Sequence, residues 1–205
     1  MVGAMATSWL RYDGAELARI GVGPGSGTQA LSGRGLPVNA HEWFVRVPER
    51  ELQVAQLPAG PRAAFLARVL DDYNQTYWLS LDDASVWMRY GEDDDASATS
   101  QRINGSVAAL QEILGAWCDF RDSDISPADE AAYDDLVCRT IIRAVSAEPE
   151  VFTDETHWWA VTFEEVEYSL QGILRGEKPL YELVRRNESG AWVLDHPGYE
   201  DEEND

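Results

Sequence analysis

The sequence has few cysteines, few basic residues and no long apolar run. Its two cysteines, Cys118 and Cys138, form no C-x-x-C pair, and each lies on the apolar face of a predicted helix. We therefore interpret both as buried thiols rather than as redox or metal sites. No apolar run approaches the roughly 18 residues that a membrane span requires, and no basic segment followed by an apolar one lies near residue 1. We expect a cytoplasmic protein without a membrane segment.

Basic residues are strongly outnumbered. The chain of 205 residues contains 16 Lys and Arg against 37 Asp and Glu, a formal charge of -21. A field of this sign repels nucleic acid and anionic membranes, and it speeds association with a basic partner. We therefore expect no direct contact with nucleic acid. Two interpretations of the acidity stay open: solubility alone, or recognition of a basic protein.

The common signatures of enzymes and metal sites are also missing. The stretch GVGPGSGT has Ser26 where a dinucleotide-binding loop has its third glycine, and no Gly-Lys-Ser/Thr follows. The stretch DSDISPADE has Pro127 where a calcium loop requires glycine. None of the three histidines, His41, His157 and His196, has a second His or Cys at metal-ligand spacing. We predict no catalytic residue, no cofactor and no metal ion.

Short apolar runs between clusters of Pro, Gly, Asp and Asn predict strands over much of residues 36–90. The candidate strands are EWFVRV, AAFLARVL, YWLSL and SVWMRY. The last two flank Asp82-Asp83-Ala84, whose length and composition suit a hairpin turn. Upstream, SWLRYDGAELARIG predicts a short helix or a strand and turn, and GVGPGSGT predicts a mobile loop.

Three helices are predicted downstream. The first begins after Ser106, a good N-cap residue, and carries an apolar stripe. The second has Ser126 as its N-cap and Pro127 at its first helical position. The third lies within residues 151–176 and begins either at Thr162, which has capping-box spacing, or earlier.

The order of these elements predicts the fold class. Strands come first, helices follow, and residues 179–194 read as a terminal hairpin before an acidic, disordered tail at 198–205. This order predicts an α+β fold, with an antiparallel sheet of about five to six strands and helices packed on it. We expect one domain over residues 1–197.

Three segments together resemble a known family. They are ALSGRGLP, which ends in Gly35-Leu36-Pro37, the strand pair YWLSLDDASVWMRY, and the polar run Arg102-Ile103-Asn104-Gly105-Ser106 that opens a helix. In this order they resemble the SUKH superfamily of bacterial toxin-immunity proteins, most closely its fourth branch. The resemblance covers residues 28–118, and the helical part at 119–176 and the hairpin follow it. Gly105, the long insertion GEDDDASATSQ and the hairpin depart from the family pattern.

The resemblance implies function through binding. Proteins of this family neutralise a cognate polymorphic toxin, often an enzyme that acts on nucleic acid, by stoichiometric occlusion without chemistry. A basic toxin would be the partner, and we expect the inhibitor to be a monomer.

Asn104-Gly105-Ser106 also matches the N-glycosylation pattern, but that pattern matters only in a secreted protein. The resemblance implies structural roles for Gly35, Leu36, Pro37, Asn104 and Ser106.

The candidate partner contacts are two acidic clusters and one tryptophan. Trp158 and Trp159 are adjacent and cannot both face the core, so at least one is expected to be partly exposed or packed under a neighbouring segment. Our hypothesis is that Trp158 lies on a binding surface. Simpler interpretations of the acidic clusters are a solvated loop and a favourable interaction with a helix dipole. The candidates are Glu92, Asp93, Asp94, Asp95, Asp122, Asp124, Asp129, Glu130 and Trp158.

Two other functions stay open at this stage. One is a regulatory or scaffold module of the same fold that binds a host protein. The other is an enzyme whose site cannot be read from the sequence, which a deep pocket with convergent polar groups would favour.

Overall fold

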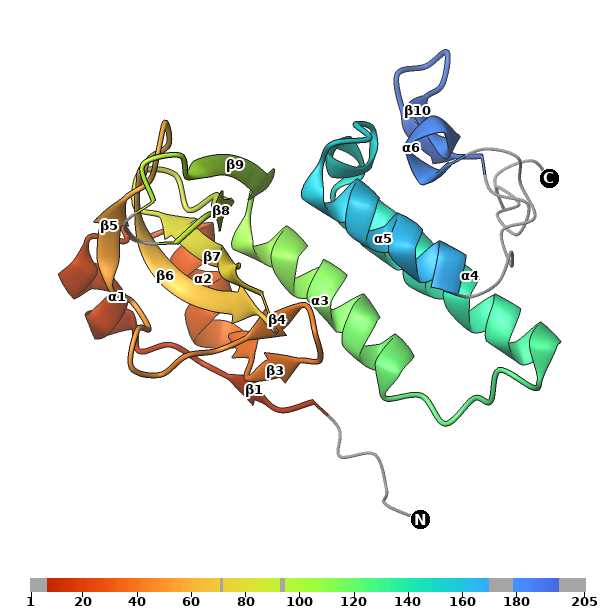
Figure 1. Ribbon diagram of the computed structural model, residues 1–205, viewed down its shortest axis with the longest axis horizontal. Helices are drawn as coiled ribbons and strands as arrows, with labels where there is room; N and C mark the ends of the chain where they lie inside the picture. Colours follow the sequence, from red (N-terminus) through yellow and green to blue (C-terminus); the bar gives the residue numbers. More distant parts are fainter. Residues whose placement is uncertain (1–6, 71, 93–94, 170–178, 196–205) are drawn as a thin grey trace. The chain divides into compact units, whose positions relative to one another are not determined.

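The computed structural model describes residues 7–70, 72–92, 95–169 and 179–195. Contacts divide the chain into two compact units, Met1–Asp122 and Ser123–Asp205 (Figure 1). The single domain expected over residues 1–197 stays a prediction, and the expected tail at 198–205 lies outside the described residues. Within the described residues, no helix is long and apolar enough to cross a membrane.

The first unit contains a seven-stranded antiparallel sheet, which confirms the predicted α+β class (Figure 1). Its strands are β3 (Asn39–Ala40), β4 (Phe44–Val45), β5 (Val54–Gln56), β6 (Arg62–Val69), β7 (Asp72–Ser80), β8 (Val86–Tyr90) and β9 (Thr99–Asn104). The order is β3-β4-β6-β7-β8-β9, and β5 also pairs with β6. The sheet exceeds the expected strand number because β3, β5 and β9 were not predicted, and β3 and β5 have only two or three residues each, too few for a period-two pattern.

The predicted hairpin joins β7 to β8. Backbone N–H groups of Asp82 and Asp83 donate to the Ser80 hydroxyl, at 3.3 and 3.4 Å. The carboxylate of Asp83 in turn accepts from the N–H and the hydroxyl of Ser85, at 3.0 and 2.6 Å. Ala84 has a φ of 58°, in the left-handed region. Short polar side chains therefore hold this turn, as the composition predicted.

Strand β9 was not predicted, because its first three residues belong to the insertion GEDDDASATSQ and its last three to the polar run that begins at Arg102. It pairs along β8, from Tyr90 opposite Thr99 to Val86 opposite Asn104. Its first four residues, Thr-Ser-Gln-Arg, are polar and exposed or only partly buried. An edge strand of this kind has a neighbour on one side only and shows no apolar alternation.

The sheet buries side chains on both faces. Phe65 and Trp78 are paired across β6 and β7, and their rings meet edge to face with centroids 5.4 Å apart. Together with Leu57 they form a small core on one face. Tyr77 and Met88 are paired across β7 and β8 and are fully buried on the other face. Adjacent residues of a strand point to opposite faces, and both faces are buried here. Strand β7 therefore has consecutive apolar residues, Tyr77 and Trp78, in its sequence.

Helix α3 (Val107–Arg121) crosses the sheet as predicted. The Ser106 hydroxyl accepts a hydrogen bond from the N–H of Ala109 at 3.1 Å, which confirms it as the N-cap. Leu110, Ile113 and Leu114 are fully buried. The helix contacts β9 and β3, the two ends of the strand order, so it spans the whole sheet. Asn104 is fully buried, which leaves no room for a glycan.

Two short helices precede the sheet: α1 (Gly14–Ile20), which Asp13 caps, and α2 (Ser26–Gly33). The expected mobile loop GVGPGSGT is therefore partly helical. Glycine is needed at position 27 of this stretch, because a Cβ there would lie 2.4 Å from the Cβ of Ala84. The buried amide of Gln111 in α3 donates to the carbonyls of Ala30 and Gly35, at 2.9 and 2.6 Å. Tertiary contacts thus order a segment whose composition favours a loop.

The segment Gly35-Leu36-Pro37 forms part of a small two-stranded sheet. Strand β1 (Trp9–Leu10) pairs antiparallel with β2 (Leu36–Pro37). Gly35 has a φ of 80°, and a Cβ there would lie 2.0 Å from the carbonyl oxygen of Leu10. Leu36 is fully buried. Gly35, Leu36 and Pro37 therefore contribute to the packing and the strand pairing of the first unit.

In its described parts, residues 123–169 and 179–195, the second unit contains three α-helices, one 3₁₀ helix and the expected hairpin. Its strands β10 and β11 pair antiparallel, with Val184 opposite Leu194. The residues LYEL, predicted as strand, form a helical turn instead. The elements are α4 (Glu130–Ala147), η1 (Pro149–Phe152), α5 (Trp158–Ser169), α6 (Leu180–Leu183), β10 (Val184–Arg186) and β11 (Trp192–Leu194).

Helix α4 begins later than predicted. The hydroxyl of Ser126 accepts from the N–H of Ala128, so it closes its own turn rather than capping the helix. The carboxylate of Asp129 accepts from the N–H of Ala132 at 3.4 Å and is the N-cap. Both residue types are good caps, and the sequence alone does not decide between them. Helix α5 begins at Trp158, which confirms the earlier of its two predicted starts.

Aromatic rings form the centre of the second unit. Phe163 of α5 meets Phe152 of η1 edge to face with centroids 5.4 Å apart, and it lies 6.3 Å from Trp159. All three rings are fully buried. Both cysteines are free thiols. Cys118 is buried as expected, and burial raises its pKa to about 11, whereas Cys138 is only partly buried.

We expect Ser106→Ala to lower the free energy of unfolding by about 1 kcal/mol, because the N–H of Ala109 loses its acceptor at the start of a mostly buried helix. Urea denaturation followed by tryptophan fluorescence measures the change. The matched control is Ser126→Ala, which removes a hydroxyl from an exposed turn and should change stability by less than about 0.5 kcal/mol. Equal losses in the two variants would contradict the assignment of Ser106 as the more important cap.

Candidate functional site

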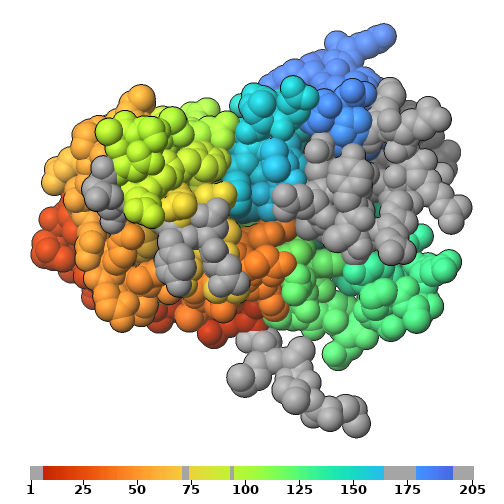
Figure 2. All heavy atoms as spheres, in the orientation of Figure 1, coloured from red at the N-terminus to blue at the C-terminus, as the bar shows by residue number. Residues whose placement is uncertain are grey.

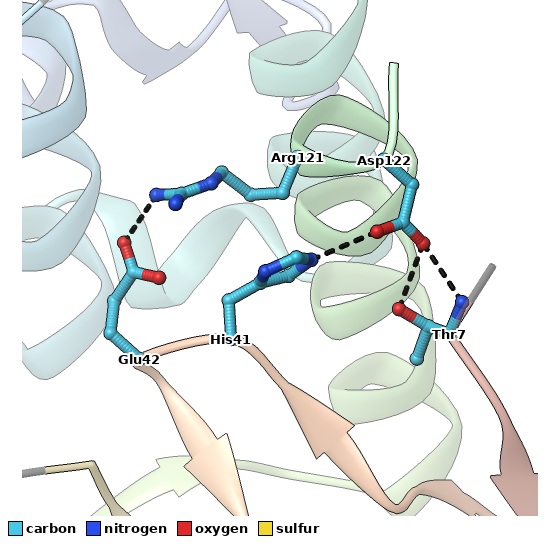
Figure 3. A network of polar contacts seen from close by, with 5 residues as sticks. All are labelled: Thr7, His41, Glu42, Arg121 and Asp122. Atoms are coloured by element: carbon cyan, nitrogen blue, oxygen red, sulfur yellow. Dashed lines mark hydrogen bonds and ion pairs between the residues drawn. The ribbon is translucent and has the colours of Figure 1, made fainter. Parts of the chain in front are cut away.

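Three segments of the first unit meet at the end of α3 around one carboxylate (Figure 3). Oδ2 of Asp122 accepts hydrogen bonds from the backbone N–H and the hydroxyl of Thr7, both at 2.9 Å. Oδ1 lies 3.0 Å from Nε2 of His41, a residue of the turn between β3 and β4. Asp122 therefore joins the segment before β1 and the β3–β4 turn to the end of the helix.

The residues next to His41 contact the last two turns of α3. The Glu42 carboxylate lies 2.6 Å from the guanidinium of Arg121 (Figure 3). The ring of Trp43 stacks on Trp117, with centroids 3.6 Å apart and planes 11° from parallel. Three consecutive residues of one turn are thus attached to the same helix.

Thr7, His41 and Asp122 have the residue types of a hydrolase triad but different connections. In a triad the hydroxyl bonds to the imidazole, and the imidazole bonds to the carboxylate. Here the hydroxyl and the imidazole are both directed at the carboxylate. This hydroxyl is not activated by a base, so we interpret the cluster as structural. Among the described residues, no group of three or more His, Cys, Asp or Glu could hold a metal ion.

Hydrogen bonds keep Asp122 in its charged form. Burial by itself would raise the pKa of this carboxyl, but the bonds from Thr7 and the contact with His41 outweigh burial and hold the pKa below the usual value for aspartate. Ionised Asp122 therefore contributes stability above about pH 4, and the contribution is lost as the pH falls through the folded-state pKa.

The first candidate acidic cluster lies in the loop between β8 and β9. Glu92 and Asp95 are exposed, whereas Asp93 and Asp94 lie outside the described residues. Asp95 accepts from the N–H and the hydroxyl of Ser97, both at 2.7 Å, and these bonds lower its pKa. The guanidinium of Arg89 donates to the carbonyl of Glu92. The loop is therefore held by local bonds and has a positive charge beside it.

The second candidate cluster does not form one group. Asp122 belongs to the network at the end of α3, in the first unit. Asp129 caps α4, and Glu130 is the first residue of that helix, where both interact favourably with the helix dipole. Asp124, Asp129 and Glu130 are exposed. Two of these four acids thus have clear structural roles, and their role as partner contacts stays a prediction.

The two adjacent tryptophans divide as expected. Trp159 is fully buried, whereas Trp158 is only partly buried. The next outward residue of the same helix, Val161, is 38% exposed. Asp154 and Glu155, in the turn before α5, are exposed. The sequence analysis missed Val161, Asp154 and Glu155, because a single valine and two acids in a turn make no recognisable pattern.

A buried ion pair was also missed. The side chain of Arg46 is 5% exposed and pairs with Glu51, and its guanidinium carbon lies 4.7 Å from the ring centroid of Tyr12. Burial raises the pKa of Tyr12 far above its usual value. Arg46 and Glu51 are near each other along the chain, whereas Tyr12 is distant, so only the fold brings its ring to the ion pair. We interpret the cluster as structural.

Negative charge is unevenly divided along the chain. Residues 123–205 contain 21 acidic and six basic residues, a formal charge of -15. Residues 1–122 contain 16 acidic and ten basic residues, a formal charge of -6. The second unit therefore carries most of the charge, although it is the shorter of the two.

Comparisons with family models, with curated proteins and with solved structures find no match for this chain.

We expect Asp122→Asn to lower the free energy of unfolding at pH 7 by about 1 kcal/mol, because the variant keeps an acceptor oxygen but loses the charge that Thr7 and His41 contact. The deficit should shrink as the pH falls below about 4, because the carboxyl of the unfolded wild type binds a proton there before the folded form does. Urea denaturation at pH 7 and pH 3 measures both values. Asp124→Asn, an exposed neighbour, is the control, and a deficit that does not change with pH would refute the role of the charge.

Proposed function

We propose that this chain is an immunity protein that binds a basic protein toxin and occludes its active site. The mechanism is stoichiometric binding, with no bond made or broken. The observation that carries the proposal is the charge of the second unit, -15 in residues 123–205. If the acidic residues served solubility alone, they would not need to be concentrated in one unit of the chain.

The chemistry of the target explains the sign of the charge. A toxin that acts on nucleic acid must hold phosphate groups, so its cleft is basic. An acidic inhibitor is electrostatically complementary to such a cleft, and the complementarity raises the rate of encounter and selects against acidic partners. We therefore propose a nucleic-acid-targeting enzyme as the partner class.

The order of elements supports the proposed SUKH assignment. Gly35-Leu36-Pro37 precedes the main strands, β7 and β8 form a hairpin, and Ser106 opens the helix that crosses the sheet. These are the positions that the resemblance assigns to the three segments. The cytoplasm is the proposed compartment, because a toxin that reaches nucleic acid is met there.

The test is co-purification of the chain with the product of the gene immediately upstream, followed by titration calorimetry. We expect one-to-one binding that weakens about tenfold or more between about 50 and 300 mM NaCl, because screening removes electrostatic attraction. Co-expression should also abolish the toxicity of the upstream product.

The outcomes separate the candidate functions. Tight binding without loss of toxicity would favour the regulatory or scaffold module. No binding, with an upstream product that has no toxic effect, would refute the immunity function for this pair. Turnover of a small molecule by the purified chain would point to the enzyme alternative.

A further inference from the structure

We propose that the toxin contacts the start of α5 and the turn before it, through Trp158, Val161, Asp154 and Glu155. We call these four residues the α5 surface. This inference rests on the proposed function and specifies which part of the chain carries it. The partner is a basic protein that has an apolar pocket next to its positively charged residues.

The apolar half of the surface is set by the helix period. Trp159, Ala160, Thr162 and Phe163 are buried, so this turn of α5 is covered on one side. Trp158 and Val161 are three residues apart and lie on the other side, one partly exposed and the other 38% exposed. Among residues 123–163 and 179–195 of the second unit, Val161 is the one large apolar side chain that is exposed. Aromatic and aliphatic anchors of this kind carry much of the energy of protein interfaces.

The acidic half is held in place by a closed turn. Oδ1 of Asp154 accepts from the N–H and the hydroxyl of Thr156, both at 2.8 Å. The carbonyl of Asp154 accepts from the N–H of His157 at 2.9 Å. Just before the turn, the buried Phe152 anchors η1 in the aromatic core. Because the turn is already ordered, little conformational entropy remains to be lost on binding.

Charge decides what occupies the surface. Asp154 and Glu155 are fully accessible, and the unit around them has a formal charge of -15. A second copy of this chain and a nucleic acid would both be repelled. A basic protein is attracted, and an apolar group on it can cover Trp158 and Val161. The segment that contains η1 and the first half of α5, cyan to blue in Figure 2, reaches the molecular surface.

The acidic loop between β8 and β9 is a natural comparison. It too displays two exposed acids, Glu92 and Asp95, and Asp95 closes a turn with Ser97 just as Asp154 does with Thr156. However, no exposed large apolar residue lies in that loop, and Arg89 is beside it. Both sites have a turn closed by an aspartate and two exposed acids, and they differ in the apolar anchor and in the neighbouring arginine.

The first experiment removes two negative charges from each site without disturbing the turns. In Asp154→Asn/Glu155→Gln and in Glu92→Gln/Asp95→Asn, each side chain keeps one acceptor oxygen, which is enough for the bonds that close the two turns. Affinity for the upstream toxin is measured by calorimetry at two salt concentrations. We expect the α5 pair to weaken binding about tenfold and to reduce its salt dependence, and the loop pair to change affinity less than about threefold.

The second experiment removes the apolar anchor. Val161→Ser should weaken binding about tenfold, mainly through faster dissociation. The matched control is Val38→Ser in the first unit, where valine is 41% exposed and the same atoms are removed. Trp158→Ala should have a larger effect, and thermal melting shows whether it still folds. Val161→Ser remains informative if it does not.

The results distinguish the two proposals. Weaker binding by both α5 variants, with unchanged controls, supports the α5 surface. Normal binding by both α5 variants, while wild-type protein still neutralises the toxin, overturns the surface and leaves the proposed function standing. Failure of the wild-type protein to bind overturns both.

Discussion

Burial of α3 against the sheet is the interaction on which the first unit depends. Eleven of its 15 residues are buried, and the helix contacts the strands at both ends of the strand order. Gln111 holds the end of α2, and Asp122 holds the segment before β1 and the β3–β4 turn. One helix thus organises parts of the chain more than 100 residues apart. Its N-cap and its last residues matter for the same reason, since they determine where it begins and what it holds.

Acidic residues serve several physical purposes in this protein, so an acidic cluster by itself does not identify a binding site. Asp13 and Asp129 cap helices, Asp83 and Asp95 close turns, and Asp122 joins separate segments. Each of these side chains accepts bonds from nearby N–H or hydroxyl groups. What distinguishes Asp154 and Glu155 is their position on an ordered turn next to the exposed Val161 and the partly buried Trp158.

The proposed inhibitor divides its tasks between its two units. The first contains the sheet, the crossing helix and the motifs on which the family resemblance depends. Most of its ion pairs join two residues of this same unit. The second is smaller and far more negative, and it presents an aromatic and an aliphatic side chain beside acids. Electrostatic attraction supplies fast and selective encounter, whereas apolar contact slows dissociation. An inhibitor that must capture a toxin quickly and hold it needs both.

The sequence by itself determined the α+β class, the β7–β8 hairpin, the Ser106 cap and the burial of one tryptophan of the pair 158–159, because local periodicity and turn chemistry are enough for these features. Tertiary structure decided the rest. Strand β9 forms because it pairs with β8. Helix α2 forms in a glycine-rich stretch because Gly27 packs against Ala84 and the side chain of Gln111 donates a hydrogen bond near the end of the helix. The tie between Thr7, His41 and Asp122 has no sequence signal, since its members lie up to 115 residues apart. The exposure of Val161 is likewise a property of the packed molecule, because helical spacing shows which residues share a face but not which face the rest of the chain leaves uncovered.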